Sequence, residues 1–167
     1  DRPTNYQRAL VEESRRYREA SASNYWADLV SVEREMGERY LGATGSVHWL
    51  TSFAPRGLMD FLAVFTGRAS VAEISGDDWT SFADGLIRVA RYLGDLNYHS
   101  FNLSLFSDFA GDGSFWVNAR VIPRFLMVEA VGTSDINYFE TMHDEVLTRM
   151  KPEDVCREAR PYFAGLG

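Results

Sequence analysis

Residues 100–124 read SFNLSLFSDFAGDGSFWVNARVIPR, and this stretch decides the fold. Apolar and polar side chains alternate over residues 100–106 and again over residues 114–124, which is typical of strands with one buried face. A segment rich in Gly and Asp, residues 107–113, joins the two runs. The sequence therefore predicts an antiparallel hairpin.

The alternation gives the predicted hairpin one apolar face and one polar face. The polar face carries Asn102, Trp116, Asn118 and Arg120. With a loop over residues 107–113, Asn102 lies opposite Asn118, within hydrogen-bonding reach. Asn and Arg side chains can hold a phosphate or a sugar hydroxyl but are poor proton acceptors at neutral pH. This face is either a ligand-binding floor or a solvated surface.

Helical and strand patterns flank the hairpin on both sides. The expected elements are two helices within the first forty residues, strands over residues 47–53 and 58–65, a helix from Ser75 or Asp77 to Leu96, an extended segment over residues 138–147, and a last helix from Pro152 to Phe163. This order predicts class α+β, an antiparallel sheet with helices packed on one side. We expect residues 1–167 to form a single domain.

The composition narrows the class of protein. With 46% hydrophobic and 14% aromatic residues, the chain can form a core. A net charge of −7 without a basic stripe argues against partners that are nucleic acids or anionic membranes. Cys156 is the single cysteine, so no internal disulfide can form. The sequence has no apolar run long enough to predict a membrane span. These features predict a cytoplasmic location.

The sequence shows no established catalytic, cofactor or metal motif. It has no phosphate loop, no dinucleotide-binding glycine pattern and no paired cysteines. The histidines His48, His99 and His143 lie far apart, and we expect Cys156 to be a core residue rather than a nucleophile. We therefore predict no catalytic residue, no cofactor and no metal in this chain.

Several short motifs occur in an order that supports a family resemblance. They are HWL at 48–50, FAP at 53–55, LNY at 96–98, IPR at 122–124 and YFE at 138–140. Their order and spacing resemble the C-terminal half of galactose-1-phosphate uridylyltransferases, which belong to the histidine-triad, or HIT-like, superfamily. The resemblance covers nearly the whole chain and implies a HIT-like antiparallel sheet.

The resemblance also identifies a departure from the family pattern. Metal-bearing members hold a structural metal with a glutamate on the first helix and three histidines on the hairpin. Glu12 or Glu13 matches the glutamate, but Asn102, Asn118 and Arg120 stand at the histidine positions. Because a guanidinium group repels a divalent cation, we expect the purified protein to carry no stoichiometric zinc or iron. Arg120 would then bridge Glu12 or Glu13 to the sheet.

A second family feature concerns the sugar. Family members contact the hexose of a UDP-sugar with a Tyr-Glu segment, which Phe139 and Glu140 match in part. Glu140 is therefore a candidate sugar-binding residue, and an exposed carboxylate of no special role is an equal alternative. The catalytic His-Pro-His motif of the family belongs to its N-terminal half and has no counterpart in this sequence.

Two functional hypotheses follow from the resemblance. In the first, the chain is the substrate-binding and structural half of a nucleotidyltransferase-like protein that acts on nucleotide sugars or sugar phosphates. It is not catalytic on its own, and it forms a homodimer or pairs with an N-terminal HIT-like half. In the alternative, it is a noncatalytic HIT-like relative that serves as a nucleotide-binding or protein-assembly domain. The candidate substrate-binding residues are Asn102, Trp116, Asn118, Arg120 and Glu140.

Overall fold

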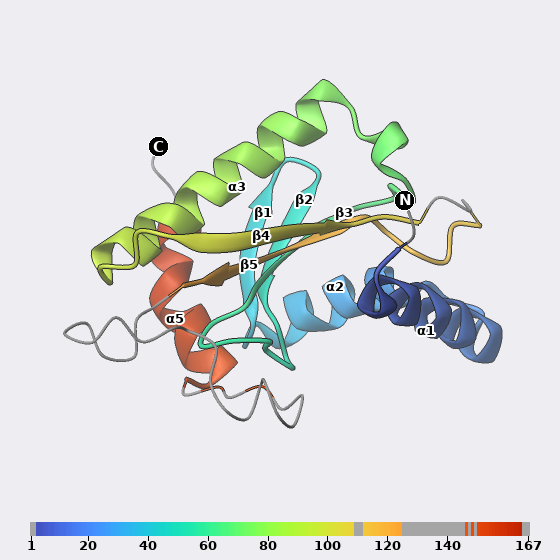
Figure 1. Cartoon of the computed structure of the whole chain (residues 1–167), viewed down its shortest axis with the longest axis horizontal. Helices are drawn as coiled ribbons and strands as arrows, with labels where there is room; N and C mark the ends of the chain where they lie inside the picture. The colour runs from blue at the N-terminus through green and yellow to red at the C-terminus, as the bar shows by residue number, and fades with distance from the viewer. Residues whose placement is uncertain (1–2, 109–111, 125–145, 147, 149, 165–167) are drawn as a thin grey trace.

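A five-stranded antiparallel sheet lies at the centre of the described structure (Figure 1). The computed structural model describes residues 3–108, 112–124, 146, 148 and 150–164. The strands are β1 (Tyr40–Thr44), β2 (Val47–Thr51), β3 (Phe61–Phe65), β4 (Phe101–Phe106) and β5 (Asn118–Pro123), in the spatial order β1-β2-β3-β5-β4. Strands β1 and β4 are therefore the two edges of the sheet.

Four α-helices accompany this sheet in the described residues. They are α1 (Asn5–Ser21), α2 (Tyr25–Met36), α3 (Gly76–Asp95) and α5 (Pro152–Phe163), with a short 3-10 helix, η1 (Val71–Glu73), before α3. Side-chain caps fix three of the helix starts: Thr4 accepts a hydrogen bond at α1, Asn24 at α2, and Ser75 forms a capping box with Asp78 at α3. None of the described helices has the length and apolarity that a membrane crossing requires.

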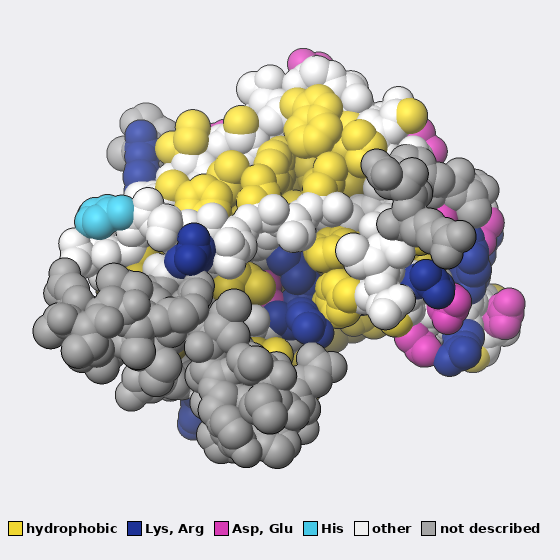
Figure 2. Space-filling view, in the orientation of Figure 1, with side chains coloured by type: hydrophobic (Ala, Val, Ile, Leu, Met, Phe, Trp, Pro, Cys, Tyr) yellow, Lys and Arg dark blue, Asp and Glu magenta, His cyan; other side chains and the backbone are white. Residues whose placement is uncertain are grey.

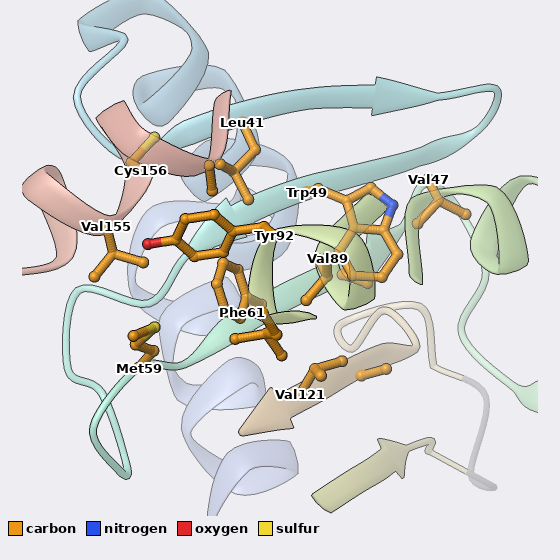
Figure 3. Close-up of a cluster of buried hydrophobic side chains, with 14 of the residues drawn as sticks. Leu41, Val47, Trp49, Met59, Phe61, Val89, Tyr92, Val121, Val155 and Cys156 are labelled. Atoms are coloured by element: carbon orange, nitrogen blue, oxygen red, sulfur yellow. The ribbon is translucent and has the colours of Figure 1, made fainter. Parts of the chain in front are cut away.

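Helices α3 and α5 pack on one side of the sheet and bury its larger apolar face. Figure 3 shows side chains from both helices meeting those of four strands in one cluster; the labelled residues are Leu41, Val47, Trp49, Met59, Phe61, Val89, Tyr92, Val121, Val155 and Cys156. The Trp49 ring stacks on Phe82 of α3, with ring centroids 5.5 Å apart. This close packing depends on Gly85, because an added Cβ there would lie 2.0 Å from Trp49 Nε1.

Helices α1 and α2 lie against the opposite face of the sheet, below the strands in Figure 1. Their apolar contact with the sheet is smaller: it consists of Val11, Trp26, Val30, Leu50, Leu62, Val64 and Phe115. The two faces follow the strand alternation, since Phe61 and Ala63 point to the α3–α5 side while Leu62 and Val64 point to the α1–α2 side.

The α+β class, the antiparallel sheet, the hairpin and the four helices are confirmed. Strand β1 was not expected: no strand was predicted between the two helices of the first forty residues and the strand over residues 47–53. Gly42 lies at a shift in the β1–β2 register, which obscures the alternation of a short strand. The extended segment predicted over residues 138–147 lies, apart from residue 146, outside the described residues.

The predicted register of the hairpin is wrong by four residues. Phe106 pairs with Asn118 rather than with Ser114, and Asn102 pairs with Ile122 rather than with Asn118. The loop is longer than predicted because residue 117 pairs elsewhere: Val117 N donates to Arg68 O, and Val117 O accepts from Phe65 N. Because the register is shifted by an even number of residues, each strand residue stays on its predicted face of the sheet. The faces were therefore predicted correctly, although the cross-strand partners were not.

Candidate functional site

The polar face predicted for the hairpin points toward α1 and α2. On this face Arg120 lies opposite Leu62 of β3, which in turn lies opposite Leu50 of β2. Both leucines belong to the apolar cluster under α1 and α2. The predicted polar face is therefore neither an open floor nor a fully solvated surface.

Arg120 forms a buried ion pair with Asp60, the residue directly before β3. Its Nη1 group donates to Asp60 Oδ2 and also to the Ser52 hydroxyl, at 3.3 Å. The Asp60 side chain is 0% exposed and that of Arg120 is 13% exposed. Burial raises the pKa of Asp60, and the Arg120 charge opposes this shift. Within the described residues, Asp60 Oδ1 and Arg120 Nε have no hydrogen-bond partner.

Two guanidinium groups lie over the same aromatic ring. The Arg56 group is 4.4 Å from the centroid of the Tyr6 ring, and the Arg120 group is 5.8 Å from it. The Arg56 backbone N–H also donates to Asp60 Oδ2, at 3.0 Å. Two cations thus face one carboxylate, which leaves one positive charge in a chain of net charge −7. Figure 2 shows Lys or Arg side chains in a hollow near the centre of the view, bordered by hydrophobic side chains.

The other predicted residues of the hairpin do not converge on Arg120. Asn118 is 0% exposed, and its Nδ2 group donates to Trp116 O at 3.0 Å. Trp116 is partly buried and packs on the cluster under α1 and α2. Asn102 is exposed on the edge strand, four residues or about 13 Å along the hairpin from the position opposite Asn118. The predicted contact between Asn102 and Asn118 is wrong because the register differs.

The predicted bridge from Arg120 to the first helix is also wrong. Glu12 and Glu13 are exposed, and Glu13 pairs with Arg16 at 2.6 Å. Arg120 instead uses Asp60, which the adjacent strand β3 brings beside it. Asp60 falls within the strand predicted over residues 58–65, but alternation within one strand does not show which distant side chain pairs with it.

The positions that the resemblance assigns to a structural metal do not fit one. Asn102 is far along the strand, the Asn118 Nδ2 group donates to Trp116 O just before β5, and Arg120 is a cation. No group of three His, Cys, Asp or Glu side chains suited to a metal occurs in the part of the chain that the structure describes. The absence of metal from the purified protein stays a prediction.

The described histidines and the cysteine are not arranged as a nucleophile with a base. His48 Nδ1 lies 2.8 Å from the Tyr40 hydroxyl, and burial, aided by Arg34, lowers the pKa of His48. His99 is exposed and contacts Asn97. Burial raises the pKa of Cys156, which disfavours the reactive thiolate. His143 and Glu140 lie outside the described residues.

Comparison with solved structures identifies the fold. A uridylyltransferase structure matches with a TM-score of 0.77 over 94% of this chain and 50% of that chain, at 11% identity. An ADP-glucose phosphorylase from Arabidopsis thaliana, solved with ADP-glucose, matches with a TM-score of 0.73 over 95% of this chain and 50% of that chain, at 10% identity. The chain has the fold of one half of a uridylyltransferase.

A smaller protein shows the same fold at lower similarity. A Hit-like protein from Bartonella henselae matches with a TM-score of 0.55 over 84% of this chain and 96% of that chain, at 13% identity. The HIT-like resemblance is thereby confirmed for the fold. At sequence identities this low, a structural match establishes the fold and not the activity.

Comparison by sequence gives a relative without an assigned role. An uncharacterized protein from Archaeoglobus fulgidus is 30% identical over 164 residues, which is 98% of this chain and 48% of that protein. No family model matches the chain. The chain thus spans about half the length of this relative and of the uridylyltransferases that it resembles.

Proposed function

We propose that this chain is the substrate-binding and structural half of a protein that acts on nucleotide sugars or sugar phosphates. The observation that carries the proposal is the arrangement of Arg56 and Arg120 around Tyr6 with one carboxylate, Asp60, against them. Guanidinium groups bind phosphate oxygens with paired, charge-assisted hydrogen bonds. The spare positive charge at this place suits a phosphate group.

The fold supports this class of ligand. The uridylyltransferases and the ADP-glucose phosphorylase share the fold, and the latter was solved with ADP-glucose bound. In this chain we assign the phosphate to Arg56 and Arg120. Trp116 and Asn118 support the strand that carries Arg120, while Asn102 and Glu140 remain candidates for the sugar.

We further propose that the chain does not catalyse the reaction alone. Its described residues offer no nucleophile beside a base, and the pKa directions of His48 and Cys156 favour their neutral forms. The catalytic histidine would come from an N-terminal HIT-like half or from a second copy of a longer protein. A cytoplasmic location stays a prediction from the sequence.

One observation favours the alternative, a protein-assembly domain. Large apolar side chains are exposed on and near α2: Val32 at 53%, Met36 at 60% and Phe53 at 74%. A face of this kind can be covered by a partner protein.

Ligand binding tests the two functions against each other. The purified chain would be titrated by calorimetry with UDP-glucose, UDP-galactose, ADP-glucose and glucose 1-phosphate, and its unfolding followed with and without each compound. At a hundred times the dissociation constant, a ligand raises the free energy of unfolding by about 2.7 kcal/mol. Replacing Arg56→Gln should weaken binding about tenfold, or about 1.4 kcal/mol.

The matched control is Arg91→Gln, which removes an exposed arginine of α3 far from Tyr6 in the sequence and on the helix of the other face. Its affinity should equal that of the wild-type chain. If no compound of the series binds, the proposal fails and the assembly domain is the better explanation.

A further inference from the structure

Arg120 also lines a cavity between α2 and the sheet. The cavity has a volume of about 120 Å³, and its wall includes Tyr25, Trp26, Glu33, Ser52 and Phe53. An engineered cavity of about 150 Å³ holds one benzene molecule, so this one accepts a compound of about six heavy atoms. It is too small for a nucleotide sugar.

The charged group that makes this cavity unusual is Glu33. Its side chain is 5% exposed, and Oε1 accepts from Arg39 Nε at 2.8 Å. The second oxygen, Oε2, is buried and has no hydrogen-bond partner among the described residues. Leaving a buried carboxylate oxygen without a donor costs free energy, so a ligand that supplies the donor is favoured.

The charges around the cavity favour a cationic donor. Arg39 is shared among three carboxylates: Glu33, Glu153 at 2.7 Å and Glu38 at 3.9 Å. Arg120 on the other part of the wall is already paired with Asp60. The carboxylates around Arg39 therefore leave negative charge beside the cavity, which an ammonium group would neutralise.

The remaining wall suits a small amine with an oxygen atom. Tyr25 and Trp26 line the cavity, and aromatic faces attract ammonium groups. The Phe53 ring already has the Arg39 guanidinium group 5.1 Å from its centroid. The Arg120 Nε–H group is buried and has no acceptor among the described residues. An oxygen of the ligand would accept a hydrogen bond from it.

We propose that this cavity binds a small primary amine that carries an oxygen acceptor, an amino alcohol or an amino acid. The ammonium group donates to Glu33 Oε2, and the oxygen accepts from Arg120 Nε–H. The two proposed sites share Arg120 but differ in ligand and in size. The phosphate site adds Arg56 over Tyr6, whereas this cavity adds Glu33 and is too small for a nucleotide sugar.

Calorimetry and NMR titration of the full chain test this site with ethanolamine and β-alanine. Ethylamine and propionate, which each lack one of the two groups, are the controls among ligands. We expect the two bifunctional compounds to bind about tenfold more tightly than either control. A preference for β-alanine would assign a carboxylate to Arg120, and a preference for ethanolamine would assign a hydroxyl group.

Variants of the protein identify the atoms involved. Glu33→Gln keeps the shape and should weaken binding about tenfold. Glu35→Gln is the matched control: it removes an exposed carboxylate of the same helix that neither lines the cavity nor pairs with Arg39, so affinity should be unchanged. Leu29→Phe narrows the cavity without altering any charge and should also reduce binding.

Three results would overturn the proposal. They are no binding by ethanolamine or β-alanine, binding of ethylamine or propionate as tight as that of the bifunctional compounds, and unchanged affinity in Glu33→Gln. If Glu33→Gln does not fold, unchanged affinity in Leu29→Phe has the same meaning. Nucleotide-sugar titrations report separately on the phosphate site.

Discussion

The two faces of the sheet are built from different chemistry. The face under α3 and α5 buries one large apolar cluster in which rings such as Trp49 and Phe82 stack. The face under α1 and α2 has a smaller apolar cluster and buries an ion pair, Arg120 with Asp60, and the carboxylate of Glu33. Of these three charged residues only Arg120 is in a strand; Asp60 lies directly before β3, and Glu33 is on α2.

This difference separates stability from function. Apolar burial on the α3–α5 face stabilises the fold and needs no further explanation. A buried ion pair rarely makes a fold more stable than apolar residues of similar volume would. Stability therefore does not explain the buried charges on the α1–α2 face. We propose ligand binding as the reason.

The largest effect is expected at the ion pair. Asp60→Ala leaves Arg120 buried without its carboxylate and should lower the free energy of unfolding by about 3–5 kcal/mol, measured by urea denaturation. The double variant Asp60→Leu with Arg120→Met should recover most of that loss, because an apolar pair of similar volume replaces both charges. A double variant as unstable as Asp60→Ala would show that the pair itself is needed for folding.

On the apolar face, overpacking should have a smaller effect. Gly85→Ala places a Cβ against the Trp49 ring and should cost about 1–3 kcal/mol in thermal or urea unfolding. The control is Gly94→Ala in the same helix, where an added Cβ meets no atom within 4 Å. This control should be neutral or more stable, because Ala favours helix over Gly by about 1 kcal/mol. Equal effects of the two changes would contradict the packing described for Trp49.

The smallest effect concerns acid stability at the loop held by α1. Hydrogen bonds from Ser114, with the Arg15 guanidinium group, lower the pKa of Asp112 to about 2 from 3.8. The carboxylate therefore stabilises the fold above pH 3.8, and this contribution is lost as the pH falls toward 2. Because Asp112 is partly exposed, we expect less than about 1 kcal/mol. Asp112→Asn should make the free energy of unfolding depend less steeply on pH over this range. An equal pH dependence in the wild-type chain and the variant would exclude the effect.

The sequence predicted those parts of the fold whose pattern is local. Alternation in the hairpin and the 3.6-residue period of α3 are strong signals, and α3, β4 and β5 all lie within the predicted ranges. Strand β1 is short and its register shifts beside Gly42, so its pattern is weak. The register of β4 on β5 depended on the pairing of Val117 with residues 65–68, which is a contact between distant segments.

The site could be predicted only in part for the same reason. Arg120 was identified from its place on the polar side of a strand, and that face is confirmed. Its partners, Asp60, Ser52 and Tyr6, come from a loop, a strand end and a helix that only the fold brings together. Periodicity reports which face a residue occupies, not which distant residue meets it there.

The most direct test of the account is to map the binding of a nucleotide sugar on the two faces. Backbone and arginine side-chain NMR signals of the purified chain would be followed during titration with UDP-glucose and ADP-glucose. The account predicts that signals of Tyr6, Ser52, Arg56 and Arg120 shift with ligand, and that signals of α3 and α5 do not. Shifts confined to the α3–α5 side, or no shifts with either compound, would contradict it.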